Sequence, residues 1–130
     1  QKPACITIVN RTAQKAQDIA VHFAAKGKIM GVGFADLEDS PFDLIIQATS
    51  IGFGNEFTLS QKIINQQTWC YDLMYGAQGT PFLHWAKKFH PACCLDGLGM
   101  LVEQASAAFY LWRGVCPATQ PVIDMLRGRK

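Results

Sequence analysis

The chain has 130 residues, of which 49% are hydrophobic and 17% are charged. This balance is typical of one folded globular domain and excludes a disordered chain. The formal net charge is only +2, and the lysines and arginines are scattered, so nucleic acids and anionic membranes are poor candidates as partners. No apolar run is long enough to span a bilayer. The five cysteines lack metal-ligand spacing and predict free thiols in a reducing cytoplasm.

Short apolar runs alternate with segments of helical periodicity along the chain. Thr12 is a suitable N-cap, and Thr80-Pro81 combines a cap with a first-turn proline. The run 43–48 is apolar without alternation, which indicates a strand covered on both faces. In chain order, the sequence predicts strand 5–9, helix 13–25, strands 29–34 and 43–48, a short helix 60–65, strand 69–73, helix 81–89, strand 92–95, and helices 99–113 and 118–126.

This alternation of strands and helices predicts an α/β fold, a Rossmann-like parallel sheet with helices on both faces. In such sheets, ligands bind in the crevice outside the carboxyl ends of the strands. The residues that follow each strand are therefore the candidates for a functional site.

The first expected strand ends in Asn10, Arg11 and Thr12, and Lys15 follows one helical turn later. In dinucleotide-binding sheets, an acidic residue near a strand end binds the ribose 2′-hydroxyl, whereas an arginine accommodates a 2′-phosphate. Here the acid is absent, and the helix N-terminus would add N–H groups and partial positive charge. The pattern is compatible with a phosphate site, and the alternative is a capped surface helix with two solvated cations.

Small and polar residues also follow the next expected strands. Ala48, Thr49 and Ser50 would let the backbone approach a ligand closely, or they would form an ordinary turn. Asp72 is expected to cap or brace the loop after its strand. Tyr75, in the same loop, is either packed or available to a ligand.

The last expected strand leads into a helix start that is rich in glycine. Gly97 and Gly99 permit a tight turn, and Met100 and Gln104 share one helix face because they are four residues apart. Gln104 lies in an otherwise apolar segment, where a buried amide needs a partner. Its partner would be either a core group or a hydroxylated ligand.

Taken in order, these motifs resemble shikimate dehydrogenase over about residues 6–126. The most specific motif is the last. The residues that carry the resemblance are Asn10-Arg11-Thr12, Ala48-Thr49-Ser50, Tyr71-Asp72 with Tyr75, Thr80-Pro81-Phe82-Leu83, and Asp96-Gly97-Leu98-Gly99-Met100-Leu101-Val102 with Gln104.

The resemblance implies an NADP-dependent oxidoreductase that reversibly reduces 3-dehydroshikimate to shikimate, in the route to chorismate and the aromatic amino acids. It implies that Asn10, Arg11 and Thr12 hold the adenosine ribose and its 2′-phosphate, with Lys15 where many members have arginine. It implies further cofactor contacts from Ala48, Thr49, Ser50, Leu73, Gly97 and Met100. It implies that Tyr75 and Gln104 contact the substrate.

Other parts of the family pattern are not found in these residues. The resemblance implies that the first strand with its glycine-rich loop, and the lysine–aspartate pair for proton transfer, lie in segments upstream of Gln1. No catalytic residue and no metal ligand is therefore expected in this chain. We expect residues 1–130 to be the C-terminal NADP-binding domain, to need the N-terminal substrate domain as a partner, and to be inactive and unstable as an isolated monomer.

Two other functions stay open. One is a quinate/shikimate dehydrogenase that uses NAD or both cofactors, although Arg11 argues against strict NAD use. The other is a nucleotide-binding paralogue without turnover. A protein-interaction domain has no support beyond apolar patches.

Overall fold

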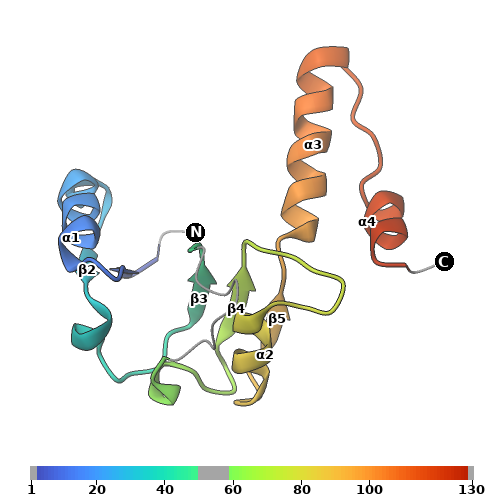
Figure 1. Cartoon of the computed structure of the whole chain (residues 1–130). Helices are drawn as coiled ribbons and strands as arrows, with labels where there is room; N and C mark the ends of the chain where they lie inside the picture. Colours follow the sequence, from blue (N-terminus) through green and yellow to red (C-terminus); the bar gives the residue numbers. More distant parts are fainter. Residues whose placement is uncertain (1–2, 50–58, 129–130) are drawn as a thin grey trace. The chain divides into compact units, whose positions relative to one another are not determined.

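The structure is a computed structural model that describes residues 3–49 and 59–128. Its contacts divide the chain into two compact units, residues 1–39 and 40–130. Both units contain parallel strands and helices (Figure 1). Among the described residues, no helix is both long and apolar enough to cross a bilayer.

The first unit is one βαβ segment. Strand β1 (Ile6–Val9) pairs in parallel with β2 (Ile29–Val32), and helix α1 (Ala13–His22) connects them. Ala16 and Ala20 form the buried stripe of α1. The helix approaches β2 so closely that a Cβ on Gly31 would lie 2.2 Å from the Ala16 carbonyl oxygen, so only glycine fits there. Two 3₁₀ turns, η1 (Ala24–Lys26) and η2 (Phe34–Asp36), complete the unit.

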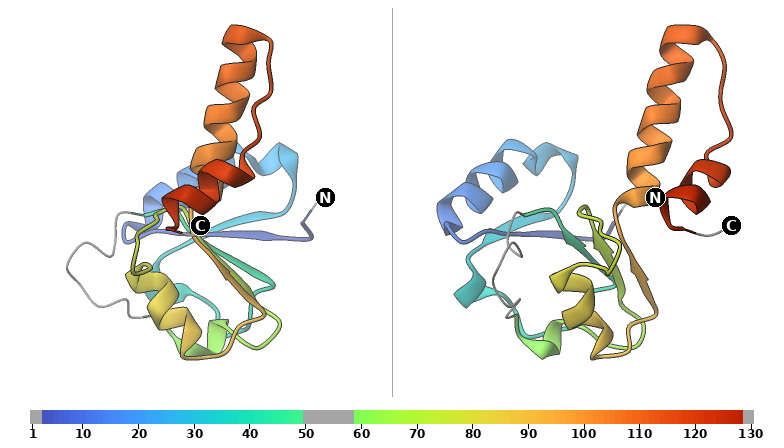
Figure 2. Two further views of the ribbon diagram at one scale, coloured as in Figure 1. Left: turned by 90° about the vertical axis from the view of Figure 1, so that its right-hand side faces the viewer. Right: turned by 45° about the vertical axis from the view of Figure 1, so that its right-hand side comes forward.

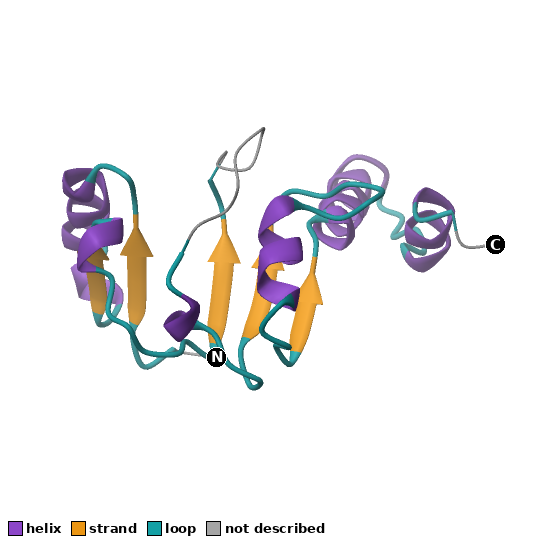
Figure 3. Cartoon of the chain, turned by 60° about the horizontal axis from the view of Figure 1, so that its bottom comes forward, coloured by secondary structure: helices purple, strands orange, loops and turns teal. Residues whose placement is uncertain are grey.

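The second unit is built on a three-stranded parallel sheet in the order β3-β4-β5 (Figure 3). Its elements are β3 (Leu44–Gln47), the 3₁₀ turn η3 (Gln61–Ile63), β4 (Trp69–Asp72), α2 (Pro81–Lys87), β5 (Cys93–Leu95), α3 (Leu98–Arg113) and α4 (Gln120–Leu126).

Helix α2 supplies the largest share of the buried apolar side chains among the described residues of this unit. It packs on β4 and β5 and buries Phe82, Leu83, Trp85 and Ala86. Phe82 stacks on Trp85, with ring centroids 5.9 Å apart. Each large apolar side chain that leaves water here contributes roughly 1.5–3 kcal/mol. This packing fixes the carboxyl ends of β4 and β5 relative to one another.

Helices α3 and α4 lie side by side (Figure 2). Their contact includes the hydroxyl of Thr119, which donates to Glu103 over 2.7 Å. The C-terminal end of α3 stays uncovered among the described residues, with Leu111 and Trp112 81% and 80% exposed. Gly114 ends this helix in the left-handed conformation (φ 68°), which favours glycine.

Three expectations about the elements were wrong. Strand β3 is not covered on both faces, because Leu44 and Ile46 are each more than half exposed while Gln47 is buried. The segment 60–65 forms only a 3₁₀ turn. Helix 13–25 ends at His22 and continues as η1. The other predicted elements are confirmed within a few residues, and so is the parallel α/β class.

The hydrogen-bonded ladders are compatible with the strand order of a Rossmann sheet. The Rossmann order 3-2-1-4-5-6 separates the strands that correspond to β1 and β3 by one further strand. In the described residues, β1 pairs only with β2, and β3 pairs only with β4. Each of these two strands therefore has one edge without a ladder partner among the described residues.

Candidate functional site

The carboxyl end of β1 is shaped by the side chain of Asn10. Its Oδ1 accepts the N–H of Thr12 over 3.0 Å, and the carbonyl of Thr12 accepts the N–H of Lys15 over 3.0 Å. Thr12 is the N-cap residue with extended backbone angles, as predicted. Its own side chain makes no capping hydrogen bond. The first turn of α1 therefore begins without a side-chain cap.

The same end of β1 is positively charged. Arg11 and Lys15 are exposed, and α1 has no acidic residue in its first turn. Within residues 3–49 and 59–128, no carboxylate forms an ion pair with either cation. Uncapped N–H groups, a helix N-terminus and two cations form an arrangement that can bind a phosphate.

The carboxyl end of β3 depends on a glutamine that the sequence analysis overlooked. The buried Gln47 accepts two hydrogen bonds at Oε1, from the N–H of Thr49 over 3.1 Å and from its hydroxyl over 3.0 Å. A polar residue at the end of an apolar run was the available signal. Ala48 is exposed and Thr49 half-buried, whereas Ser50 lies outside the described residues.

The carboxyl end of β4 is braced by Asp72, as expected. Asp72 is 2% exposed. Its Oδ1 accepts the N–H of Met74 over 3.0 Å, and its Oδ2 accepts the hydroxyl of Thr80 over 2.5 Å. Thr80 in turn caps α2 by accepting the N–H of Leu83 over 3.3 Å. This carboxylate is fully engaged inside the protein.

Leu73 and Gly97 meet where β4 and β5 end. The N–H of Gly97 donates to the carbonyl of Met74 over 3.0 Å, and a Cβ on Gly97 would lie 2.0 Å from the Leu73 carbonyl oxygen. Gly97 has ordinary right-handed backbone angles, so space and not conformation requires the glycine. The structure thus brings together two of the predicted cofactor contacts.

Met100, Gln104 and Tyr75 point outward to different degrees. Tyr75 is 51% and Met100 39% exposed. Gln104 is exposed and has no hydrogen-bond partner among the described residues. Its interpretation as a core amide was therefore wrong, because the apolar stripe of α3 turns other residues inward. Its role toward a ligand stays a prediction.

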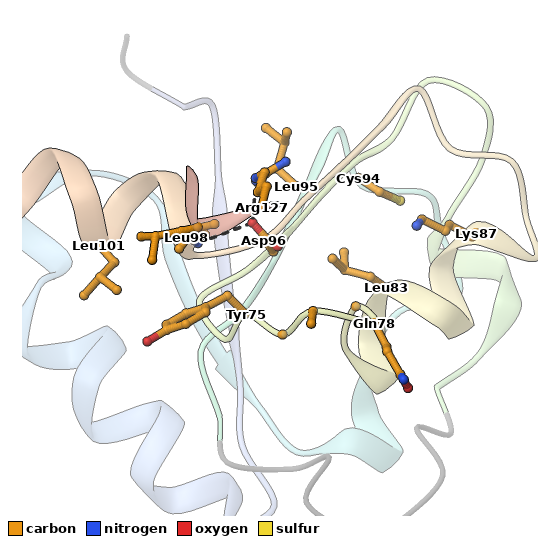
Figure 4. Close-up of a pocket in the computed structure, with 14 residues that line it drawn as sticks. Tyr75, Gln78, Leu83, Lys87, Cys94, Leu95, Asp96, Leu98, Leu101 and Arg127 are labelled. Carbon is orange, nitrogen blue, oxygen red and sulfur yellow. Dashed lines mark hydrogen bonds and ion pairs between the residues drawn. The ribbon is translucent and has the colours of Figure 1, made fainter. Parts of the chain in front are cut away.

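A cavity of about 670 Å³ opens between the β4–α2 loop, α2, β5, the start of α3 and the end of α4 (Figure 4). Of the predicted site residues that the structure describes, only Tyr75 lines it. Lys87 and Cys94 lie at one end, and Tyr75, Leu98 and Leu101 at the other (Figure 4).

The cavity also contains an ion pair that the sequence did not predict. Nη2 of Arg127 lies 2.8 Å from Oδ1 of Asp96, in a pair whose side chains are 33% and 18% exposed. The two residues are separated by 31 positions, so no local pattern could reveal them.

All five cysteines are free, in agreement with the sequence. Cys93 and Cys94 lie in β5 and are half-buried, and Cys70 is buried beside Cys94. Burial, reinforced by Cys94, raises the pKa of Cys70 to about 12. Burial also raises the pKa of Cys94, although Lys87 opposes this shift. Burial and raised pKa values are typical of structural rather than reactive thiols. The described residues contain no group of side chains that could hold a metal ion.

Comparison with known proteins gives one consistent relationship. Residues 97–126 match the sequence profile described as "Shikimate 5'-dehydrogenase C-terminal domain". A shikimate dehydrogenase (NADP(+)) of Hahella chejuensis is 50% identical over 126 residues, which are 96% of this chain and 46% of that protein. The chain thus spans about half the length of the curated relatives it matches.

Solved structures share the fold of this chain. An Ael1 enzyme from Pseudomonas putida is 35% identical with a TM-score of 0.82, over 95% of this chain and 46% of its own. A shikimate dehydrogenase in complex with NADP+ is 25% identical with a TM-score of 0.75, over 95% of this chain and 54% of its own. The resemblance inferred from the motifs is confirmed: the chain is related, in sequence and in fold, to the C-terminal part of the shikimate dehydrogenases.

Proposed function

We propose that the full-length protein is a shikimate dehydrogenase that reversibly reduces 3-dehydroshikimate to shikimate with NADPH. The observation that carries the proposal is the end of β1, where Arg11 and Lys15 are exposed beside an uncapped helix start without a first-turn acid. This chemistry suits a 2′-phosphate and not a free ribose diol. The names of the relatives support the same cofactor and the same reaction.

On the cofactor side, the proposed roles are those that the family resemblance implies, and the chemistry of Arg11 and Lys15 suits them. The fork of Arg11 would grip the 2′-phosphate, and Lys15 would add a point charge. Asn10 stabilises the turn between β1 and α1. Thr12 would offer its hydroxyl to the phosphate, together with the backbone N–H groups at the start of α1. Further contacts are proposed for Ala48, Thr49, Ser50, Leu73, Gly97 and Met100. NADPH, when bound, supplies the hydride.

On the substrate side, Tyr75 and Gln104 would bind the hydroxyl groups of shikimate. Both are exposed and polar, and the amide of Gln104 has no partner among the described residues. No residue of this chain is proposed to transfer the proton. The family resemblance assigns that step to a lysine and an aspartate in an N-terminal substrate domain, which we propose as the partner of residues 1–130. The five free thiols support a cytoplasmic location.

The test is steady-state turnover of the full-length protein with shikimate or quinate and with NADP or NAD, followed by the absorbance of the reduced nicotinamide. We expect high kcat/KM only for shikimate with NADP. Comparable use of quinate or NAD would instead identify a broad quinate/shikimate dehydrogenase. A folded protein without turnover on any pair would overturn the enzyme assignment and favour a nucleotide-binding paralogue.

A further inference from the structure

The loop between β4 and α2, residues 73–79, is tied to the protein at both of its ends. Asp72 comes immediately before it and Thr80 immediately after it, and these two side chains are joined by the 2.5 Å hydrogen bond between the Thr80 hydroxyl and Oδ2 of Asp72. Both residues are buried, at 2% and 4% exposure. We refer to this pair as the Asp72–Thr80 clamp.

The clamp is also connected to the elements on either side of the loop. Oδ1 of Asp72 accepts a hydrogen bond from the N–H of Met74. The carbonyl of Met74 accepts one from the N–H of Gly97 at the start of α3. On the other side, the hydroxyl of Thr80 accepts the N–H of Leu83 in α2. A single buried carboxylate therefore links the ends of β4 and β5 to the N-terminus of α2.

The middle of the loop is held by its own backbone and by α2. The N–H of Gly79 donates to the carbonyl of Gly76 over 3.0 Å, and Gly79 has a φ of 86°, which favours glycine. Nε2 of His84 in α2 lies 2.8 Å from the carbonyl oxygen of Gln78. The loop backbone is thus fixed, while the side chain of Tyr75 is 51% exposed and lines the cavity (Figure 4).

We propose that Asp72 and Thr80 are positioning residues, which fix the loop so that Tyr75 and the Leu73–Gly97 contact face their ligands in one geometry. The inference rests on the proposed function for the identity of those ligands. A rigid backbone that presents an exposed side chain is the arrangement required of a preorganised binding site. Neither side chain of the clamp touches the ligand in this proposal, since both are buried and already hydrogen-bonded.

The decisive variants in the full-length protein are Thr80→Val and Thr80→Ser. Valine keeps the shape but removes the hydroxyl, so that Oδ2 of Asp72 loses its donor and Leu83 loses its cap. Serine restores both hydrogen bonds. We expect Thr80→Val to lower kcat/KM for shikimate by about 10- to 100-fold, mainly through KM. KM for NADP should rise by a smaller factor, because the clamp also holds Leu73 and Gly97 but does not hold Arg11. Thr80→Ser should stay within about 3-fold of the unmodified protein.

A matched control is available at the start of α4. Thr119 is also an N-cap threonine that donates to a carboxylate, that of Glu103, but the pair is exposed. Thr119→Val should therefore leave KM for shikimate unchanged. Asp72→Asn is the second clamp variant, in case Thr80→Val does not fold: it keeps an acceptor for Met74 but leaves the Thr80 hydroxyl without a carboxylate, and it should raise KM in the same way.

Hydrogen exchange tests whether the clamp holds the loop, independently of enzymatic activity. The amides of Met74 and Gly97 should lose protection in Thr80→Val and in Asp72→Asn, because the loop opens more often once the clamp is broken, even where the acceptor for Met74 is kept. They should keep their protection in Thr80→Ser and Thr119→Val. Unchanged amide protection together with an unchanged KM in Thr80→Val would overturn the clamp. A Thr80→Ser protein that restores neither the protection nor KM would also overturn it. If the unmodified protein did not turn over shikimate, the proposed function would fail while the exchange experiment still decided whether the clamp holds the loop.

Discussion

The ends of β1 and β4 occupy comparable places in parallel ladders, yet they use their polar groups in opposite ways. At β1, Arg11 and Lys15 are exposed and have no ion-pair partner in the described part of the chain. At β4, Asp72 is buried and accepts two hydrogen bonds from the protein. A charged residue at a strand end is therefore a candidate ligand contact only when its hydrogen-bonding groups are still available.

The polar groups at the end of β1 face outward and those at the end of β4 face inward, so substitutions at the two strand ends should have different effects. A change at an inward-facing end should alter stability, because it breaks contacts within the protein. A change at an outward-facing end should alter ligand binding and leave stability nearly unchanged.

The largest effect should come from Gly97→Ala, because the new Cβ would lie 2.0 Å from a backbone oxygen that cannot rotate away. We expect a loss of about 3 kcal/mol in the free energy of unfolding of the full-length protein, measured by chemical denaturation. The matched control is Gly99→Ala in the same helix, where a Cβ meets nothing within 4 Å. That change should stabilise the protein by about 0.5–1 kcal/mol. Equal effects of the two substitutions would contradict the close approach at Leu73.

At the outward-facing end, Arg11→Ala should raise KM for NADP by roughly 10- to 100-fold, as expected when a charge-assisted hydrogen bond worth about 1.5–3 kcal/mol is lost. KM for NAD should change little, and so should the thermal midpoint. Arg11→Lys should recover only part of the loss, because lysine has no fork. Lys26→Ala removes another exposed cation of the same unit and serves as the control. An unchanged KM for NADP in an active Arg11→Ala protein would refute the phosphate role.

Signals that lie within a few residues could be read from the sequence. The cap formed by Thr80 with Pro81 and the alternation of strands with helices depend only on near neighbours, and they are confirmed. The bracing role of Asp72 was also predicted, because short polar residues at strand ends fold back on the following loop.

Features that depend on distant partners could not be read in this way. The exposure of Leu44 and Ile46 depends on which other elements cover the strand. The outward position of Gln104 depends on the rotation of α3. Gln47 is an exception, because its partner Thr49 is only two residues away. The signal was a single polar residue at the end of an apolar run, and it was overlooked. Local capping and bracing were thus predictable, whereas the exposure of individual side chains was not.

Inside the sheet, Cys70 gives a test that depends on pH. Its pKa is raised from 9.0 to about 12 in the folded protein, first by burial and then by Cys94. Below pH 9 the thiol is neutral in the folded and the unfolded chain. Above pH 9 the unfolded chain loses this proton while the folded chain keeps it, so the free energy of unfolding should fall by up to about 1.4 kcal/mol per pH unit until about pH 12.

Denaturation of the unmodified protein and of Cys70→Ala from pH 8 to about pH 11 measures this contribution. The variant should be less stable at pH 8, because it leaves a cavity, and its stability should fall less steeply as the pH rises. Cys5→Ala removes an exposed thiol and is the matched control. Parallel pH profiles for the unmodified protein and Cys70→Ala would show that the buried thiol is not the source of the slope.

The smallest effect is expected for the ion pair of Asp96 with Arg127. Asp96, like Asp72, accepts a backbone N–H just after its strand, but it is more exposed. Asp96 accepts the N–H of Leu98 over 3.3 Å and pairs with Arg127 over 2.8 Å. Because water screens a partly exposed pair, Arg127→Ala should lower the free energy of unfolding by less than about 1 kcal/mol, with a difference that shrinks further at high salt. A loss as large as that of Gly97→Ala would mean that the packing of α4 depends on this ion pair. Burial alone would then not distinguish carboxylates that brace the fold from those that contribute little to stability.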